Sequence, residues 1–79
     1  MNMNDLETVS YKVKNYNDLF EYYGDMSKFI CEHENIFSIE DQINFLKDAN
    51  KTMNEFSKFV KDNQTELFVM YLIGGMMNE

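Results

Sequence analysis

The 79-residue chain lacks proline, tryptophan and arginine, and it has one cysteine, one histidine and three glycines. With no proline and so little glycine, no linker or low-complexity stretch divides the sequence, and no internal repeat is visible. This length is enough for one domain, so we predict a single domain spanning residues 1–79. The single cysteine, Cys31, excludes a disulfide framework within the chain.

Residues that carry chemistry are equally scarce. His33 is the only histidine, and Cys31 lies two residues before it, a spacing that points the two side chains to different faces of a helix. One chain cannot supply the four Cys or His ligands of a structural zinc site. The sequence has neither a phosphate-binding glycine loop nor a calcium loop. We therefore expect a protein that is not an enzyme and has no catalytic residues, no metal and no cofactor.

A long hydrophobic segment is also missing. The longest apolar run, residues 67–73, holds seven residues, and it reaches eleven positions only when counted through Met77 with two glycines included. A membrane-spanning helix needs about 20 apolar residues, and the start of the chain resembles no secretory signal. We expect a cytoplasmic protein that does not interact with a membrane. Residues 67–73 are then part of a core or of a contact surface.

Helical periodicity, by contrast, is abundant. Residues 18–31 repeat apolar side chains every three or four positions, and Asn17 is a candidate N-cap. Gly24 lies inside this stretch, where glycine costs about 1 kcal/mol relative to alanine. The pattern predicts an amphipathic helix over about residues 18–31. Its apolar stripe consists of Leu19, Tyr22, Tyr23, Met26, Phe29 and Ile30.

A second helix is predicted over residues 39–62. Ser38 is a good N-cap, and Asp41 follows three residues later in an arrangement that resembles a capping box. The short connection between the two predicted helices favours an antiparallel hairpin. The apolar positions of the second helix, spaced by three or four residues, are Ile39, Ile43, Leu46, Ala49, Met53, Phe56 and Val60.

The two ends of the chain allow two readings. Residues 7–13 alternate like a strand and could pair with residues 66–73 in a two-stranded antiparallel sheet. Both segments also keep helical spacing; Asn63 and Glu66 would cap the second one, and Gly74 would end it. We predict a mainly α fold, a small helical bundle with helical termini, and keep the two-stranded sheet as the alternative.

The net charge of −7 is concentrated in one part of the sequence. Residues 18–41 contain seven carboxylates and a single lysine, Lys28, so their net charge is −6. The first four carboxylates fall within about 60° of one another on a helix and form an acidic stripe. A second row, at seven-residue spacing from Asp41 to Asp62, has Lys51 and Lys58 nearby to compensate it. The predicted partner-binding residues are Asp18, Glu21, Asp25, Glu32, Glu34, Glu40 and Asp41.

The uncompensated acidic region can be interpreted as a surface without a binding role or as a functional one. It can be a solubilising surface, or it can be a contact surface for a basic partner, because opposite charges speed encounter and select partners. The same charge argues against direct binding of nucleic acid, whose phosphates would be repelled. Our functional prediction is a non-enzymatic acidic protein that inhibits or modulates a basic partner. The alternative is a structural or assembly adaptor that acts through its apolar helical surface.

In size, acidity, predicted helix content and lack of catalytic residues, the chain resembles the loose class of small acidic phage proteins that imitate DNA. Proteins of that class block host nucleoid or transcription proteins. The resemblance implies action in the host cytoplasm on a DNA-binding protein, for example a histone-like nucleoid protein such as HU or a transcription protein. Carboxylates on a helix would then occupy a cleft built for phosphates, and Tyr22 and Phe37 would add affinity that does not depend on charge.

The apolar content also predicts a homodimer. Of the 79 residues 44% are apolar, which is more than so small a chain can readily hide. Asn63 falls at a core-like position and is a candidate for fixing the register of two copies. The predicted dimer interface consists of Leu67, Met70, Tyr71 and Ile73.

Overall fold

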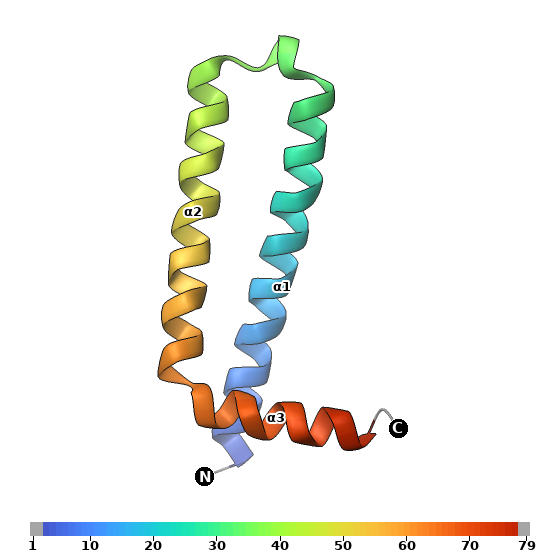
Figure 1. Ribbon diagram of the computed structural model, residues 1–79, viewed down its shortest axis with the longest axis vertical. Coiled ribbons are helices and arrows are strands. Elements are labelled where there is room, and N and C mark those ends of the chain that lie inside the picture. Colours follow the sequence, from blue (N-terminus) through green and yellow to red (C-terminus); the bar gives the residue numbers. More distant parts are fainter. Residues whose placement is uncertain (1–2, 78–79) are drawn as a thin grey trace.

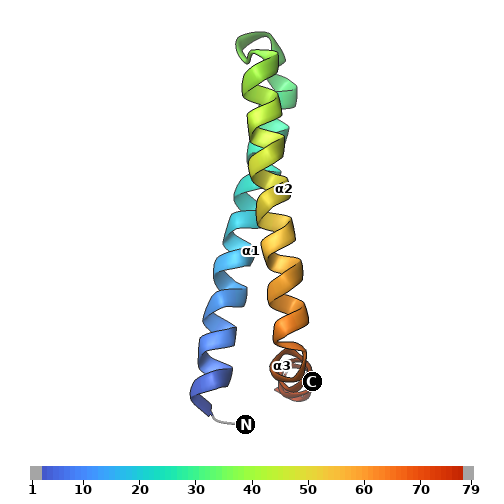
Figure 2. The ribbon, with the colours of Figure 1, turned by 90° about the vertical axis from the view of Figure 1, so that its left-hand side faces the viewer.

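The fold is an antiparallel pair of long helices with a third helix set across one end (Figure 1). The computed structural model describes residues 3–77. Helix α1 (Met3–Glu32) leads through a short 3-10 turn, η1 (Glu34–Ile36), into α2 (Ile39–Asp62), and α3 (Gln64–Met77) follows. The end of the helix pair that carries η1 is termed the tip, and the end that carries α3 the foot. Helix α3 crosses the foot of α1 and projects beyond it (Figures 1 and 2).

The mainly α prediction and the hairpin are confirmed, and α2 has the predicted bounds. The predicted start of the first helix at residue 18 is wrong, because α1 begins at Met3 and runs through Asn17 without interruption. The alternative of a two-stranded sheet is also wrong, since residues 3–77 contain no strand. Val9 is 5% exposed and Tyr11 is 68% exposed, but they alternate around a helix rather than across a strand.

Two heptad seams hold α1 and α2 together. On each helix the residues that face the other recur at alternating spacings of three and four, the pattern of a coiled coil. This seam continues without a break from residue 6, which is why α1 is one helix and not two elements. On α1 the seam consists of Leu6, Val9, Val13, Tyr16, Phe20, Tyr23 and Ile30, and on α2 of Gln42, Phe45, Ala49, Thr52, Phe56 and Phe59.

Aromatic rings form the centre of the packing between the two helices. The ring centroid of Phe56 lies 5.1 Å from that of Tyr16 and 5.0 Å from that of Phe20, both in edge-to-face arrangements. Such pairs contribute about 0.5–1.5 kcal/mol each beyond the area that they bury. Nearer the tip, the hydroxyls of Tyr23 and Thr52 are 3.1 Å apart and hydrogen-bonded, which satisfies the buried threonine.

The predicted apolar stripe of α2 coincides only in part with the face that packs on α1. Ala49 and Phe56 lie in the seam, but most of the remaining stripe faces solvent. The seam is instead completed by Phe45 and Phe59, which pair with the tyrosine rings of α1. Helix α2 therefore carries two apolar faces, and α1 covers one of them. The exposed stripe residues are Ile39 at 77%, Ile43 at 46%, Leu46 at 63% and Met53 at 51%.

Local hydrogen bonds set both ends of α2. The Ser38 hydroxyl accepts a hydrogen bond from the backbone N–H of Asp41 at 3.0 Å, so the predicted N-cap is confirmed. At the other end the Asn63 side chain donates to the carbonyl of Phe59 at 2.8 Å, which ends the helix. The chain turns at this residue, so α3 runs in a different direction from α2 (Figure 1).

Helix α3 is nearly all apolar after its first turn. It runs through Gly74 to Met77, so the prediction that Gly74 ends the helix is wrong, and neither Gly24 nor Gly74 takes a positive φ. Phe68 is 62% exposed and Tyr71 76% exposed, because the helix meets the rest of the chain along one side only. Within the described residues no helix has both the length and the apolar character that a membrane crossing requires.

Candidate functional site

The acidic stripe lies on the side of α1 that faces away from α2. Asp18, Asp25 and Glu32 each follow a seam residue of α1 by two positions. Two positions correspond to about 200° around a helix, so these carboxylates point away from the packed side. Glu21 stands beside them, and all four side chains of the stripe are exposed. Because α1 is one long helix at the edge of the hairpin (Figure 1), the spacing of the four carboxylates arranges them in one row along its outer side.

The tip adds three further exposed carboxylates, which belong to η1 and α2 and not to α1. Glu34 belongs to η1, while Glu40 and Asp41 lie in the first turn of α2, where the helix dipole favours negative charge. Ile36 and Ile39, exposed by 65% and 77%, lie among these carboxylates in the sequence. The tip therefore combines negative charge with accessible apolar surface.

The described part of the molecule leaves the negative charge of the stripe and the tip unpaired. No ion pair within 4.0 Å forms between the side chains that the structure describes. Lys28, the lysine nearest the stripe in sequence, is exposed and makes no such pair. The net charge of −6 on residues 18–41 is therefore available to a partner.

The second acidic row, on α2, has a different environment. Lys12 of α1 and Lys58 of α2 line the same surface hollow of about 330 Å³ as Glu55 and Asp62. Charges of both signs thus lie close together on this side of the hairpin. The excess of negative over positive charge is concentrated on the outer side of α1 and at the tip.

Sequence reasoning missed the lower part of the outer surface of α1, because it began the helix at residue 18. Tyr11 lies seven residues before Asp18, which places it on the same side of α1 as the stripe. Its ring is 68% exposed, and Tyr22 beside the stripe is 56% exposed. The seven-residue spacing of Tyr11, Asp18, Asp25 and Glu32 was the available signal. Phe37, the other aromatic residue expected near the acids, is half-buried against Phe29.

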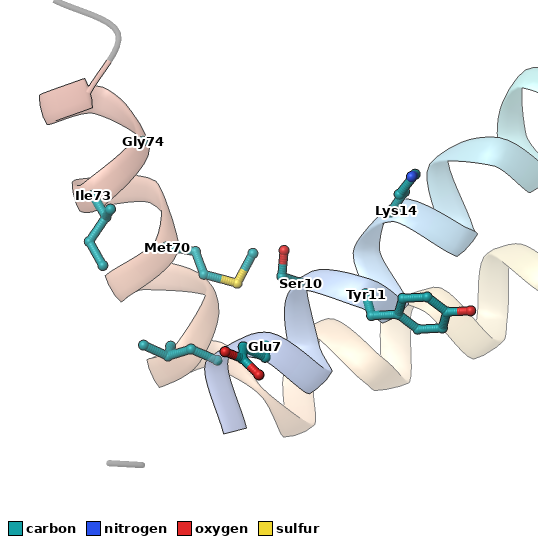
Figure 3. Close-up of a pocket in the computed structure, with 8 residues that line it drawn as sticks. Glu7, Ser10, Tyr11, Lys14, Met70, Ile73 and Gly74 are labelled. Carbon is teal, nitrogen blue, oxygen red and sulfur yellow. The ribbon is translucent and has the colours of Figure 1, made fainter. Parts of the chain in front are cut away.

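The four residues predicted to form a dimer interface do not share one surface. Met70 and Ile73 line a pocket of about 580 Å³ between α3 and the foot of α1. Met70 points across this pocket toward Ser10 (Figure 3). Leu67 is half-buried, whereas Tyr71 is 76% exposed and does not line the pocket. Two of the four predicted interface residues thus border a pocket within the chain, and one of these, Ile73, is still 44% exposed.

Cys31 and His33 have local structural surroundings. The imidazole Nδ1 of His33 donates to the carbonyl of Phe29 at 2.9 Å, and the ring stacks on Phe29 with centroids 4.3 Å apart. This contact satisfies a carbonyl at the end of α1. Cys31 is an exposed free thiol. In the part of the chain that the structure describes, no three His, Cys, Asp or Glu side chains are grouped to hold a metal ion.

Comparison with known proteins gives no indication of function. No protein-family model, curated protein or solved structure matched the sequence or the fold. The structure offers two candidate binding surfaces. One is the acidic outer side of α1 with the tip, and the other is the apolar surface of α2 and α3 that α1 does not cover.

Proposed function

We propose that the protein is a non-enzymatic acidic binding protein that inhibits or modulates a basic protein partner, in the cytoplasm as the sequence predicts. The observation that carries the proposal is the unpaired charge of −6 on residues 18–41, displayed along the outer side of α1 and around the tip. A surface with this field raises the rate of encounter with a positively charged partner and disfavours negatively charged ones.

Side chains next to the carboxylates supply the non-electrostatic part of the contact. Tyr11, Tyr22 and Phe29 are exposed by 68%, 56% and 44% on or beside the acidic side of α1. Aromatic side chains are enriched in protein interfaces because they bury a large area at a small entropic cost. The partner that fits is a basic surface with apolar positions between its positive charges.

A DNA-binding protein is the partner class that we favour. Its basic cleft is built to neutralise a row of phosphates, and a row of carboxylates on a straight helix presents charge of the same sign in a line. Duplex DNA should then compete with this protein for the partner. A histone-like nucleoid protein such as HU and a bacterial transcription protein are the first candidates to test.

Neutralising the acidic stripe tests the proposal. The test variant carries Asp18→Asn, Glu21→Gln, Asp25→Asn and Glu32→Gln, which keep the shape of each side chain. An exposed charge pair is worth roughly 0.2–1 kcal/mol, so four of them predict a loss of affinity of roughly fourfold to 700-fold. The matched control changes the net charge equally at exposed carboxylates elsewhere, with Asp5→Asn, Asp48→Asn, Glu55→Gln and Asp62→Asn.

Tagged versions of the three proteins are used to capture partners from a bacterial lysate at low and high salt, followed by titrations with purified HU and with each captured protein. We expect the wild type and the control to retain a basic partner that high salt and a short DNA duplex release, and the test variant to lose it. Partners that bind the test variant and the wild type equally at low salt would refute the proposal. A partner that duplex DNA does not displace would refute the assignment to a DNA-binding protein.

The second candidate function is a structural or assembly adaptor that acts through apolar surface. The observation that favours it is α3, which projects from the foot with Phe68, Tyr71 and Leu72 exposed by 62%, 76% and 47%. Binding of this kind would persist at high salt and would be unaffected by the acidic-stripe variant. The same capture experiment therefore distinguishes the two functions.

A further inference from the structure

The apolar face of α2 that α1 does not cover forms a second seam of its own, here named the outer seam. It repeats every seven residues through Ile39, Leu46 and Met53 to Val60, with Ile43 and Asn50 at the intervening positions. A helix with two such seams has a helical neighbour on each in a bundle. Within the described chain α1 occupies the inner seam, and the outer seam has no neighbour.

Surface hollows show which side of the hairpin the outer seam occupies. Lys12 of α1 and Glu55 of α2 share one hollow and mark one side. Ser10 and Met53 each lie two residues away from these markers, about 200° around their helices, so both are on the opposite side. Ser10 also lines the pocket beneath α3, so α3 stands on that side as well. The outer seam and α3 therefore share one side of the hairpin.

Gly24 of α1 is on this same side, two heptads after Ser10. A Cβ added there would meet no atom within 4 Å, so the fold of the single chain does not require a glycine at this position. Glycine in a helix interior costs about 1 kcal/mol relative to alanine. The one side of α1 that borders the outer seam thus has a gap where another helix can approach closely.

The chain exposes more surface than a compact protein of its mass. Its accessible area is 6508 Å², whereas the scaling for folded monomers gives about 5,000 Å² for 9.5 kDa. Its radius of gyration is 16.5 Å, against about 12 Å for a compact chain of this length. A standard interface buries about 800 Å² on each partner. The surplus of about 1,500 Å² on each copy exceeds what a stable dimer needs.

We propose that a second copy of this chain packs on the outer seam in antiparallel orientation, forming a four-helix bundle around a two-fold axis perpendicular to the helices. The outer seam is self-complementary about a point between Ala49 and Asn50: reversing it there places Leu46 opposite Met53 of the second copy, and Ile39 opposite Val60. Asn50 then lies beside its own copy, as a polar residue that sets register in a coiled coil does.

The same axis passes close to Gly24. Contacts between the helices, such as the 3.1 Å hydrogen bond of Tyr23 with Thr52 and the ring pair of Phe20 with Phe56, place Gly24 at about the height of Asn50. A two-fold axis beside Asn50 therefore brings Gly24 opposite its own copy as well. The closest approach of α1 to the second α1 falls where a side chain is absent.

Charge and the placement of α3 select the antiparallel arrangement over a parallel one. A parallel dimer would bring two tips of net charge −6 together, whereas the antiparallel dimer holds them at opposite ends. It also sets each tip, with Ile36 and Ile39 exposed, next to α3 of the second copy, whose Phe68 and Tyr71 are exposed. The exposed apolar side chains of the tip and of α3 would then cover each other in the dimer.

This inference is independent of the proposed function. The acidic stripe lies on the outer side of α1, away from α2, and the dimer displays it twice. A monomer that still binds a basic partner would overturn the dimer alone, and a dimer without such a partner would overturn the function alone.

The first experiment measures mass by sedimentation equilibrium, with helix content followed by circular dichroism. We expect twice the 9.5 kDa of one chain for the wild type. The variant Leu46→Gln with Met53→Gln should raise the dissociation constant at least 100-fold. The matched control, Leu19→Gln with Tyr22→Gln on other sides of the hairpin, should leave it unchanged within about threefold, since a surface substitution away from the contact has little effect.

A second variant separates loss of the dimer from loss of folding. Gly24→Leu introduces a better helix former into open space, so the hairpin of one chain should be at least as stable as before. The added side chain obstructs the approach of the two α1 helices, and the dissociation constant should rise at least tenfold. If the double glutamine variant fails to fold, the result with Gly24→Leu decides.

Orientation is tested by cross-linking in a Cys31→Ser background with a short bis-maleimide. Mixed Leu46→Cys and Met53→Cys proteins should cross-link to each other, while Leu46→Cys alone should cross-link at least tenfold more slowly. Rapid cross-linking of Leu46→Cys to itself would overturn the antiparallel arrangement. A wild type that stays monomeric at 100 μM, or a dimer that survives both the glutamine variant and Gly24→Leu, would overturn the outer seam as the site.

Discussion

Replacing Phe56 by leucine tests whether the aromatic cluster holds α1 and α2 together. The substitution keeps a large apolar side chain but removes two edge-to-face ring pairs, those with Tyr16 and Phe20 at 5.1 and 5.0 Å. At about 0.5–1.5 kcal/mol for each pair, the free energy of unfolding should fall by about 1–3 kcal/mol. A folded chain of this size has about 4–12 kcal/mol in all, so the loss is a large fraction of it.

Phe45→Leu is the matched control for this prediction. Phe45 also faces α1, but it makes a single ring pair, with Tyr23 at 5.8 Å, so we expect about half the loss. Urea and thermal unfolding at one fixed protein concentration give both values, since the stability of a dimer depends on concentration. A loss of 2 kcal/mol corresponds to about 8–16 °C in Tm. A loss for Phe45→Leu equal to or greater than that for Phe56→Leu would refute the argument from ring pairs.

Three further predictions concern the helix ends and the charge. Ser38→Ala should lower the free energy of unfolding by about 1 kcal/mol while Ser38→Asp retains it, because the hydroxyl accepts from the N–H of Asp41; equal urea midpoints for the two variants would contradict this. Asn63→Ala should cost about 0.5–1.5 kcal/mol in the same assay, because the carbonyl of Phe59 loses its side-chain donor at 2.8 Å and keeps only the backbone N–H of Asn63 at 3.1 Å; an unchanged urea midpoint would contradict this. The acidic-stripe variant should melt at a higher temperature than the wild type at low salt, and the difference should vanish at 0.5 M salt because screening removes the repulsion between carboxylates; a difference that persists would contradict its electrostatic origin.

Part of this architecture could be predicted from spacing alone. The bounds of α2 and the cap at Ser38 followed from periodicity and from one local hydrogen bond, both of which involve residues close in sequence. A helical N-terminus was predicted, but not its continuity with residues 18–31, because Val9, Tyr11 and Val13 also alternate as in a strand. That local signal is weaker than the heptad seam, which packs on α2 and continues to Leu6, where it meets Met70 and Ile73 of α3. Both partners are distant from it in sequence.

The face of α2 that packs inward could not be predicted in the same way. Its sequence offers two apolar stripes of similar strength, and Ile39, Leu46 and Met53 are as apolar as the residues of the inner seam. Which stripe is buried depends on the shapes that α1 presents. The ring of Tyr16 on α1 packs against the rings of Phe56 and Phe59 at centroid distances of 5.1 and 5.4 Å, and the aliphatic stripe is left outside.

Spacing and composition along the chain are enough to predict the helical class, the hairpin and the concentration of negative charge in residues 18–41. The packing of the helices was needed to show that the acids of α1 face away from α2, that a second apolar seam stays uncovered, and that α3 turns aside at Asn63. The physical reason is the same in each case. Periodicity specifies which residues share a side of a helix, but the partner across the interface selects the side that is buried.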